Sequence, residues 1–314
     1  MNDLARITAM TLSIAAVERD TGLSKDTLRV WERRYGFPTP GRDGVGERAY
    51  TFDQVEKLRV IKRLMDAGNR PGRIVSLPYA ELQLLSLSTV EQTKRQVPVA
   101  LGSGDLATYM GLLRRHEIAD LRTELNRSLS RHGVARFVTE VVSPLGTAVG
   151  DAWVRGQMKV FEEHMYTEAM QSVLRVAIAS IPEPPAGARP RVLLTTFPGE
   201  PHGLGLLMAE AMFALEGACC VSLGVQTPLW DIVQASTAHR ADIVAMSFSG
   251  SMNPNQVVDG LTELRQKLPG AVRVWAGGSS PVLHRRRVEG VEPMSSLEQV
   301  PVELRGLRES MGWV

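Results

Sequence analysis

A short segment in the second half of the chain carries residue types that bind metals. Glu200 and His202 are separated by one residue, and Gly205 follows three positions later. Imidazole is a common metal ligand, and a ligating histidine usually donates its other ring N–H to a carboxylate or a carbonyl. The spacing therefore indicates a metal ligand with a supporting carboxylate, although an ordinary loop histidine fits this segment equally well.

The segments on either side of this loop predict a strand and a helix. Residues 191–194 form a β-rich apolar run, and residues 206–215 form a helix-length stretch of Ala, Met and Leu. A loop that follows a strand lies at the carboxyl end of a sheet, where open α/β domains bind ligands. We therefore expect His202 at the ligand-binding edge of a sheet.

Strands and helices continue to alternate as far as residue 276. The predicted strands are 192–195, 218–223, 243–247 and 272–276, and the predicted helices are 205–216, 228–236 and 255–267. This order predicts a doubly wound parallel sheet of the Rossmann-like class in an α/β domain at 190–314. Cys219 and Cys220 lie inside the second strand, so we expect buried thiols.

The other predicted loops at this edge carry small residues, which leave room for a bulky ligand group beside the sheet. The chain has no Gly-x-Gly-x-x-Gly, so a phosphate-binding dinucleotide loop is disfavoured. The small residues at the ends of the third and fourth strands are Ser247, Ser249, Gly277 and Gly278.

Composition and length limit the class of protein. The 314 residues suggest about two or three domains, and 44% hydrophobic and 22% charged residues are ordinary for a globular protein. A net charge of +2 means that any contact with nucleic acid must be local. No apolar run approaches the ~18 residues of a membrane span, and the start of the chain lacks the layout of a signal peptide. We expect a cytoplasmic protein without a membrane partner.

The N-terminal domain, placed at 10–77, predicts two short helices joined by a glycine-containing turn. Ser13 caps the first helix, and Ser24 caps a second helix that begins at Lys25. This is the layout of a helix-turn-helix. In the second helix, Leu28 and Trp31 are expected to face the core.

Polar side chains on the other faces of the second helix suit a DNA groove, because guanidinium groups recognise guanine edges and phosphates. Residues 39–50 are punctuated by glycines and predict a two-stranded wing after this helix. The candidate DNA-binding residues are Thr27, Arg29 and Arg33 on the helix and Arg42, Arg48 and Tyr50 on the wing.

The middle of the chain predicts a short helix and linker at 78–104 and a four-helix bundle at 105–181. The third of these helices, 134–153, contains Pro144 and Gly146, which are expected to kink or interrupt it. Trp153 ends that helix, and Glu163 and His164 begin the fourth. A break at Gly156 could bring these three side chains together, but the pattern alone favours Trp153 in the core and the other two in a solvated first turn.

The N-terminal domain resembles the winged helix-turn-helix of the MerR family. The shared residues are Ser24-x-x-Thr27-Leu28-Arg29-x-Trp31-Glu32-Arg33, the wing ending Arg48-Ala49-Tyr50, and Leu58 and Ile61 in the next helix. The resemblance implies a dimer on double-stranded operator DNA, with recognition helix and wing in contact. MerR proteins dimerise through a long C-terminal helix, and this chain has no obvious equivalent because Pro78 follows almost at once.

The C-terminal domain resembles a cobalamin-binding domain whose pattern is acidic residue-x-His-x-x-Gly, then Ser-x-Leu, then Gly-Gly. The resemblance implies that His202 ligates cobalt from below and that Glu200 supports its other nitrogen. Ser249 stands where that pattern has leucine. The corresponding motifs are Glu200-x-His202-x-x-Gly205, Ser247-Phe248-Ser249 and Gly277-Gly278, and the residues of the last two motifs would line the pocket for the nucleotide tail.

The order of the three domains resembles the CarH/LitR class of light-responsive repressors, which are not enzymes. That class carries Trp, nine residues and then Glu-His as a cap over the adenosyl group of adenosylcobalamin, matched here by Trp153, Glu163 and His164. In its light-sensing members a histidine directly follows the Trp, and here that residue is Val154. The resemblance implies a cobalamin-dependent photoreceptor and repressor that works as a dimer or tetramer.

Two other functions remain open at this point. The first is a DNA-binding regulator whose cobalamin domain is vestigial or insensitive to light and which acts through a partner protein. The second is a corrinoid carrier of a methyltransferase or mutase, although the winged helix argues against it and 314 residues leave no room for a catalytic barrel.

Overall fold

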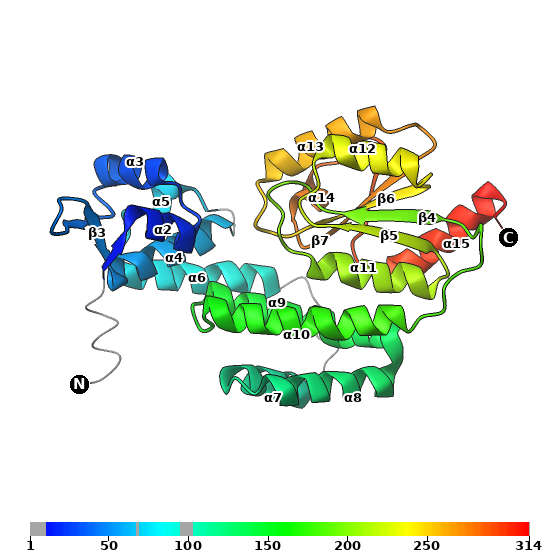
Figure 1. Ribbon diagram of the computed structural model, residues 1–314, viewed down its shortest axis with the longest axis horizontal. Coiled ribbons are helices and arrows are strands. Elements are labelled where there is room, and N and C mark those ends of the chain that lie inside the picture. Colours follow the sequence, from blue (N-terminus) through cyan, green and yellow to red (C-terminus); the bar gives the residue numbers. More distant parts are fainter. Residues whose placement is uncertain (1–10, 67–68, 95–102, 314) are drawn as a thin grey trace. The chain divides into compact units, whose positions relative to one another are not determined.

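The computed structural model describes residues 11–66, 69–94 and 103–313. These residues divide into two compact units, and each is described by itself. The first unit comprises the chain up to Val97 together with Asp151–Gln157, and the second comprises Pro98–Gly150 and Met158–Val314. Figure 1 shows both units and labels their elements where there is room.

The helix-turn-helix of the first unit forms as its capping residues predict. The Ser13 side chain accepts from the Ala16 N–H at the start of α2 (Ile14–Thr21), and the Ser24 side chain accepts from the Thr27 N–H at the start of α3 (Lys25–Tyr35). Gly22 ends α2 with a φ of 69°, the left-handed conformation that glycine adopts without strain. The predicted pair of capped helices is confirmed.

The wing is a small antiparallel sheet with one strand more than predicted. Strand β3 (Arg48–Thr51) lies between β2 (Gly41–Arg42) and β1 (Thr11–Ser13). The pairing places Leu12 opposite Tyr50. A segment of only three residues carries too little period-two pattern to predict a strand, which is why β1 was missed.

Three helices complete the first unit: α4 (Phe52–Asp66), α5 (Pro71–Ile74) and α6 (Tyr79–Lys94). The core of this unit contains Leu28 and Trp31, as expected, and also Leu58. The short helix and linker predicted at 78–104 are wrong in extent, because a helix of 16 residues continues to Lys94. Leu82 anchors its first turns in the core, and the Glu, Gln and Lys that follow are good helix formers. Residues 95–102 of that prediction lie outside the described residues.

The second unit begins with the helices of the bundle: α7 (Ser103–Arg114), α8 (Ile118–Arg136), the π-helical segment η1 (Phe137–Val142), α9 (Ser143–Val154), whose last turn belongs to the first unit, and α10 (Val160–Ala179). Gly133 is non-helical, with a φ of 72° and a ψ of 167°, and it separates the second and third helices as predicted. The interruption expected at Pro144 occurs just before it. The Ser143 N–H bonds to the Val138 carbonyl five residues back, so that Pro144, which has no N–H, enters α9 in its first turn.

The predicted parallel sheet is confirmed, with one extra strand at its edge. Its strands are β4 (Arg191–Thr195), β5 (Cys219–Gly224), β6 (Ile243–Phe248), β7 (Arg273–Gly278) and β8 (Val291–Pro293). They lie in the order β5-β4-β6-β7-β8, and every neighbouring pair is parallel. The order reverses between β4 and β6, so this domain has its topological switch point there. The loops after these two strands hold Glu200 and His202 on one side and Ser249 on the other.

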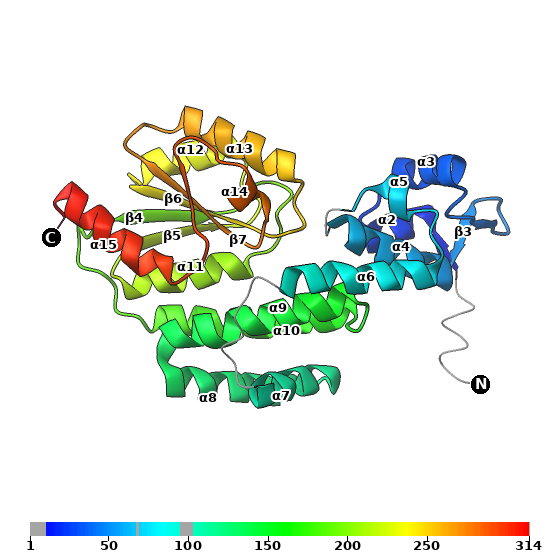
Figure 2. The same ribbon diagram turned by 180° about the vertical axis from the view of Figure 1, so that it is seen from behind.

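Helices cover both faces of this sheet. One face carries α11 (Leu204–Leu215) and α15 (Gln299–Met311), and the other carries α12 (Leu229–Ala238) and α13 (Pro254–Lys267) (Figures 1 and 2). The short α14 (Val282–Arg285) follows β7. Bundle helix α10 packs along α11 within the same unit.

The expectation of buried thiols is wrong. Cys219 and Cys220 are half-buried, because β5 is an edge strand of the sheet. Partial burial still raises the pKa of the Cys220 thiol to about 12. Cys220 is therefore a protonated, weakly reactive thiol near neutral pH.

Candidate functional sites

The loop between β4 and α11 turns Glu200 into the protein. Gly199 adopts a φ of 87°, and the Glu200 N–H then donates to the Phe197 carbonyl at 3.0 Å. The Thr196 hydroxyl donates to the Glu200 carbonyl at 2.7 Å and fixes the other end of the turn. The Glu200 side chain is 0% exposed at the carboxyl end of the sheet. A buried carboxylate is costly unless it is hydrogen-bonded, so its partners show what it does.

His202 is the first of these partners. Its Nδ1 lies 2.6 Å from Glu200 Oε1, and its backbone N–H donates to the same oxygen at 3.1 Å. The imidazole is 56% exposed although the carboxylate beneath it is completely buried. Because Nδ1 bonds to Glu200, the ring directs Nε2 away from the carboxylate. This is the geometry of a metal-ligating histidine whose second nitrogen is held by an acidic group.

Ser249, at the end of β6, is the second partner of Glu200. Its backbone N–H donates to Glu200 Oε2 at 2.7 Å, and its Oγ lies 2.8 Å from Oε2 and 3.0 Å from Oε1. Burial by itself would raise the pKa of Glu200, but the hydrogen bonds from His202 and Ser249 outweigh that effect and hold the pKa below its ordinary value. The sequence assigned Ser249 only to the lining of a pocket, and this contact was missed.

The glycines of the predicted motifs lie where a neighbouring strand or side chain leaves little or no room for a Cβ. A Cβ on Gly205 would stand 2.7 Å from Ser247 Oγ, so glycine lets the first turn of α11 approach the end of β6. A Cβ on Gly278 would stand 2.2 Å from the Phe248 carbonyl oxygen, where β6 and β7 end together. Gly277 lies next to Met294. The structure thus brings Gly205, Ser247, Gly277 and Gly278 to the same edge of the sheet as His202.

The three predicted cap residues fall in different units. In the first unit, the Arg63 guanidinium of α4 lies 5.5 Å from the centre of the half-buried Trp153 ring. In the second unit, Glu163 and His164 lie in the first turns of α10, with His164 Nδ1 2.8 Å from Glu163 Oε2. The Thr167 hydroxyl donates to the other oxygen of Glu163 at 2.7 Å. The common site for these residues stays a prediction.

The candidate DNA-binding residues on α3 lie outside its buried face, as the sequence pattern predicted. Leu28 and Trp31 are buried, whereas Arg29 and Arg33 are exposed and Thr27 is half-buried. Arg29 Nη1 lies 3.1 Å from Asp26, and such an exposed ion pair contributes little to stability.

Each of the two wing arginines makes a contact within the first unit. Arg48 Nε lies 2.8 Å from Glu32 of α3, and this hydrogen bond raises the pKa of Arg48. The Arg42 guanidinium donates to the Gly46 carbonyl at 3.0 Å and closes the turn of the wing. Tyr50 is a correction, because its side chain is 0% exposed and packs in the core of the first unit, where it supports the wing from inside instead of facing DNA.

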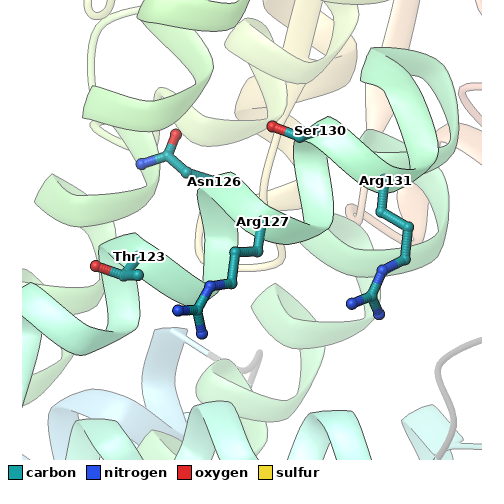
Figure 3. Close-up of a pocket in the computed structure, with 5 residues that line it drawn as sticks. All are labelled: Thr123, Asn126, Arg127, Ser130 and Arg131. Carbon is teal, nitrogen blue, oxygen red and sulfur yellow. The ribbon is translucent and has the colours of Figure 1, made fainter.

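A shallow depression on the bundle surface also gathers polar groups. Figure 3 shows that its lining side chains all come from α8: Thr123, Asn126, Arg127, Ser130 and Arg131. They project side by side from one helix, and Arg127 pairs with Glu124 of that helix. The side chains do not converge on a common point, so this surface lacks the geometry of a ligand site.

A winged helix-turn-helix followed by a helical bundle and a parallel α/β domain with a carboxylate-supported histidine defines a class of regulator. The family of MerR HTH regulatory proteins matches residues 12–76, and two B12 binding domain families match residues 109–178 and 190–293. The chain is 30% identical over 272 residues to the HTH-type transcriptional repressor CarH of Myxococcus xanthus, covering 84% of this chain and 87% of that protein. It is 29% identical over 272 residues to the repressor CarA of the same organism, covering 86% and 88%.

The chain therefore belongs to the family of CarH-type transcriptional regulators, which join a MerR HTH to B12 binding domains. Among solved structures, the monomethylamine corrinoid protein of Methanosarcina barkeri matches with a TM-score of 0.51 and 17% identity, over 66% of this chain and all of that one. At that identity the likeness supports the fold alone. Among the described helices, none has the length and apolar character needed to cross a membrane.

Proposed function

We propose that this protein is a cobalamin-dependent transcriptional repressor whose hold on operator DNA is set by adenosylcobalamin. The observation that carries the proposal is the His202–Glu200 pair at the switch point of the sheet, in a chain that also presents an arginine-bearing recognition helix. Its relatives CarH and CarA are transcriptional repressors by name. A cytoplasmic location follows from the proposal, because the operator DNA lies there.

The residues at the sheet edge fit a corrinoid. His202 would ligate cobalt through Nε2, because Nδ1 is held by Glu200 at 2.6 Å. Ser247, Gly277 and Gly278 would lie beside the nucleotide tail. Trp153, Glu163 and His164 would cover the upper adenosyl group, an assignment that rests on the family resemblance.

When bound, adenosylcobalamin supplies a cobalt–carbon bond that light breaks. The protein's part is to bind and orient this group and to convert its presence into a preferred assembly. We propose a homo-oligomer, a dimer or tetramer, whose population adenosylcobalamin shifts by binding one state more tightly than the other. The residue after Trp153 is Val154, whose side chain cannot coordinate cobalt. The proposed light response therefore uses no cobalt ligand at that position.

If α3 is the recognition helix, replacing one of its exposed arginines should lower the affinity for DNA. A duplex selected from a random-sequence library by the wild-type chain serves as the probe. Arg29→Ala is expected to weaken binding by about 1–3 kcal/mol if the guanidinium reads a guanine. If it neutralises a phosphate instead, the slope of log affinity against log salt falls by about 1. Fluorescence anisotropy over a salt series measures both quantities.

Arg305→Ala is the matched control, because Arg305 is an exposed arginine on α15 in the other unit. It removes the same charge and should leave both affinity and salt slope unchanged. Equal behaviour of the Arg29→Ala and wild-type proteins would show that α3 is not the recognition helix.

A further inference from the structure

The hydroxyl of Ser249 lies within hydrogen-bond distance of several polar atoms. Besides both oxygens of Glu200, it lies 2.6 Å from Ser251 Oγ and 3.2 Å from His202 Nδ1. The Ser251 Oγ in turn lies 3.4 Å from the same Nδ1. The family pattern described above has leucine at position 249, a side chain that makes no hydrogen bond. Ser249 therefore supplies hydrogen bonds that the leucine of that pattern would not.

Counting donors assigns the direction of these hydrogen bonds. A hydroxyl carries one hydrogen and accepts through its lone pairs, while an ionised carboxylate only accepts. Ser249 therefore donates to Glu200 and accepts from the hydroxyl of Ser251 and from its backbone N–H, which lies at 3.2 Å. Glu200 Oε2 then receives the backbone N–H and hydroxyl of Ser249, and Oε1 receives the backbone N–H and Nδ1–H of His202. Both oxygens of the buried carboxylate are satisfied.

This arrangement constrains the histidine through the carboxylate. The donors from Ser249 to Oε2 and from His202 to Oε1 hold Glu200 with Oε1 facing Nδ1 at 2.6 Å. That contact favours the imidazole form with its proton on Nδ1 and fixes the plane of the ring. Without the Ser249 hydroxyl, the carboxylate loses one donor while fully buried, and its rotation is limited only by the remaining N–H groups.

We propose that Ser249 is a positioning residue, which acts through Glu200 to hold His202 in the Nδ1–H form with Nε2 directed at the ligand. The inference deepens the proposed function and rests on it for the identity of the ligand, cobalt of a corrinoid. The ring orientation itself is a property of the chain alone. It can be measured before any ligand is added.

The test compares three substitutions in the full-length protein. Ser249→Ala removes the hydroxyl, Ser249→Leu introduces the residue of the family pattern, and Ser249→Thr retains a hydroxyl. In the ligand-free protein, ¹⁵N NMR of the imidazole is expected to show the Nδ1–H form for wild type and Ser249→Thr and a mixture of forms for Ser249→Ala and Ser249→Leu. Titration with adenosylcobalamin in the dark should give about tenfold weaker binding for the last two, with rescue by threonine, as for other groups that support a metal ligand.

Ser222→Ala, at an exposed serine of β5, controls for loss of a hydroxyl elsewhere in the sheet. Ser249→Ala with a wild-type imidazole spectrum and wild-type affinity would overturn the positioning role. If Ser249→Leu fails to fold, the alanine and threonine variants decide the question between them. If the wild-type protein binds no adenosylcobalamin, the proposed function fails, whereas the imidazole spectra still decide for or against positioning by Ser249.

Discussion

Replacing His202 with alanine is expected to lower the affinity for adenosylcobalamin by at least about tenfold and to change the visible spectrum of whatever remains bound. Substitutions of groups that merely support a metal ligand already cost about 10–100-fold, and His202 is proposed as the ligand itself. Its Nδ1 is held at 2.6 Å by a buried carboxylate, so the ring is oriented for coordination through Nε2. Absorbance titration in the dark measures both affinity and spectrum.

The matched control is His239→Ala, which removes an exposed histidine at the end of α12 in the same domain. It should bind adenosylcobalamin as the wild type does. If His202→Ala retained both the affinity and the spectrum of the wild type, the assignment of His202 as lower ligand would be wrong, while binding by the fold itself would still stand.

Gly278→Ala is expected to destabilise the α/β domain by roughly 3 kcal/mol or more, because the added Cβ strains the backbone and overlaps the neighbouring strand. Gly278 has a φ of 112°, a conformation that side-chain-bearing residues rarely adopt. An added Cβ would also lie 2.2 Å from the Phe248 carbonyl oxygen and 2.9 Å from its nitrogen, and both are backbone atoms of the neighbouring strand. Strain and overlap therefore act together at the end of β7. Urea unfolding of the ligand-free protein measures the change in the free energy of unfolding.

Gly270→Ala provides the comparison. Gly270 lies between α13 and β7, and a Cβ there meets no atom within 4 Å. The unfolding free energy of this variant should stay within about 0.5 kcal/mol of the wild type, as for most surface substitutions. Equal stability of the two alanine variants would contradict the close approach of β6 and β7 at Gly278.

Much of the fold could be predicted because local and global signals agree. Ser13 and Ser24 cap the helices that their positions indicate, and Gly22 supplies the turn between them. The alternation of apolar runs with helical segments after position 190 led to the parallel sheet. The elements after residue 278, namely α14, β8 and α15, were not predicted.

The features that were missed depend on tertiary contacts. Strand β1 has three residues and exists because Leu12 pairs with Tyr50 across the wing. An interruption at Pro144 was expected, but its form, a π-helical segment at Phe137–Val142, was not predicted. Tyr50 carried a DNA-binding pattern, but packing placed it inside.

In the candidate site, too, the local sequence indicated one contact, and a second contact depended on the tertiary fold. The Glu-x-His spacing indicated the pair, because two residues on one short loop can come close together, although an ordinary loop histidine fitted the spacing equally well. Ser249 is 49 positions away from Glu200 along the chain, and their contact requires that β4 and β6 be neighbours. A serine at the leucine position of the motif was a signal for that contact, since a hydroxyl beside a buried carboxylate is a donor.

The central claim is that adenosylcobalamin bound by this chain controls its hold on DNA. The most direct measurement is fluorescence anisotropy of the full-length protein on a duplex selected by the cobalamin-loaded chain, compared without ligand, with adenosylcobalamin in the dark, and after green light. We expect the ligand to tighten DNA binding in the dark by about 5–150-fold, the usual range of coupling between two sites. Green light should return the affinity to the ligand-free value. The same DNA affinity under all three conditions would contradict the account.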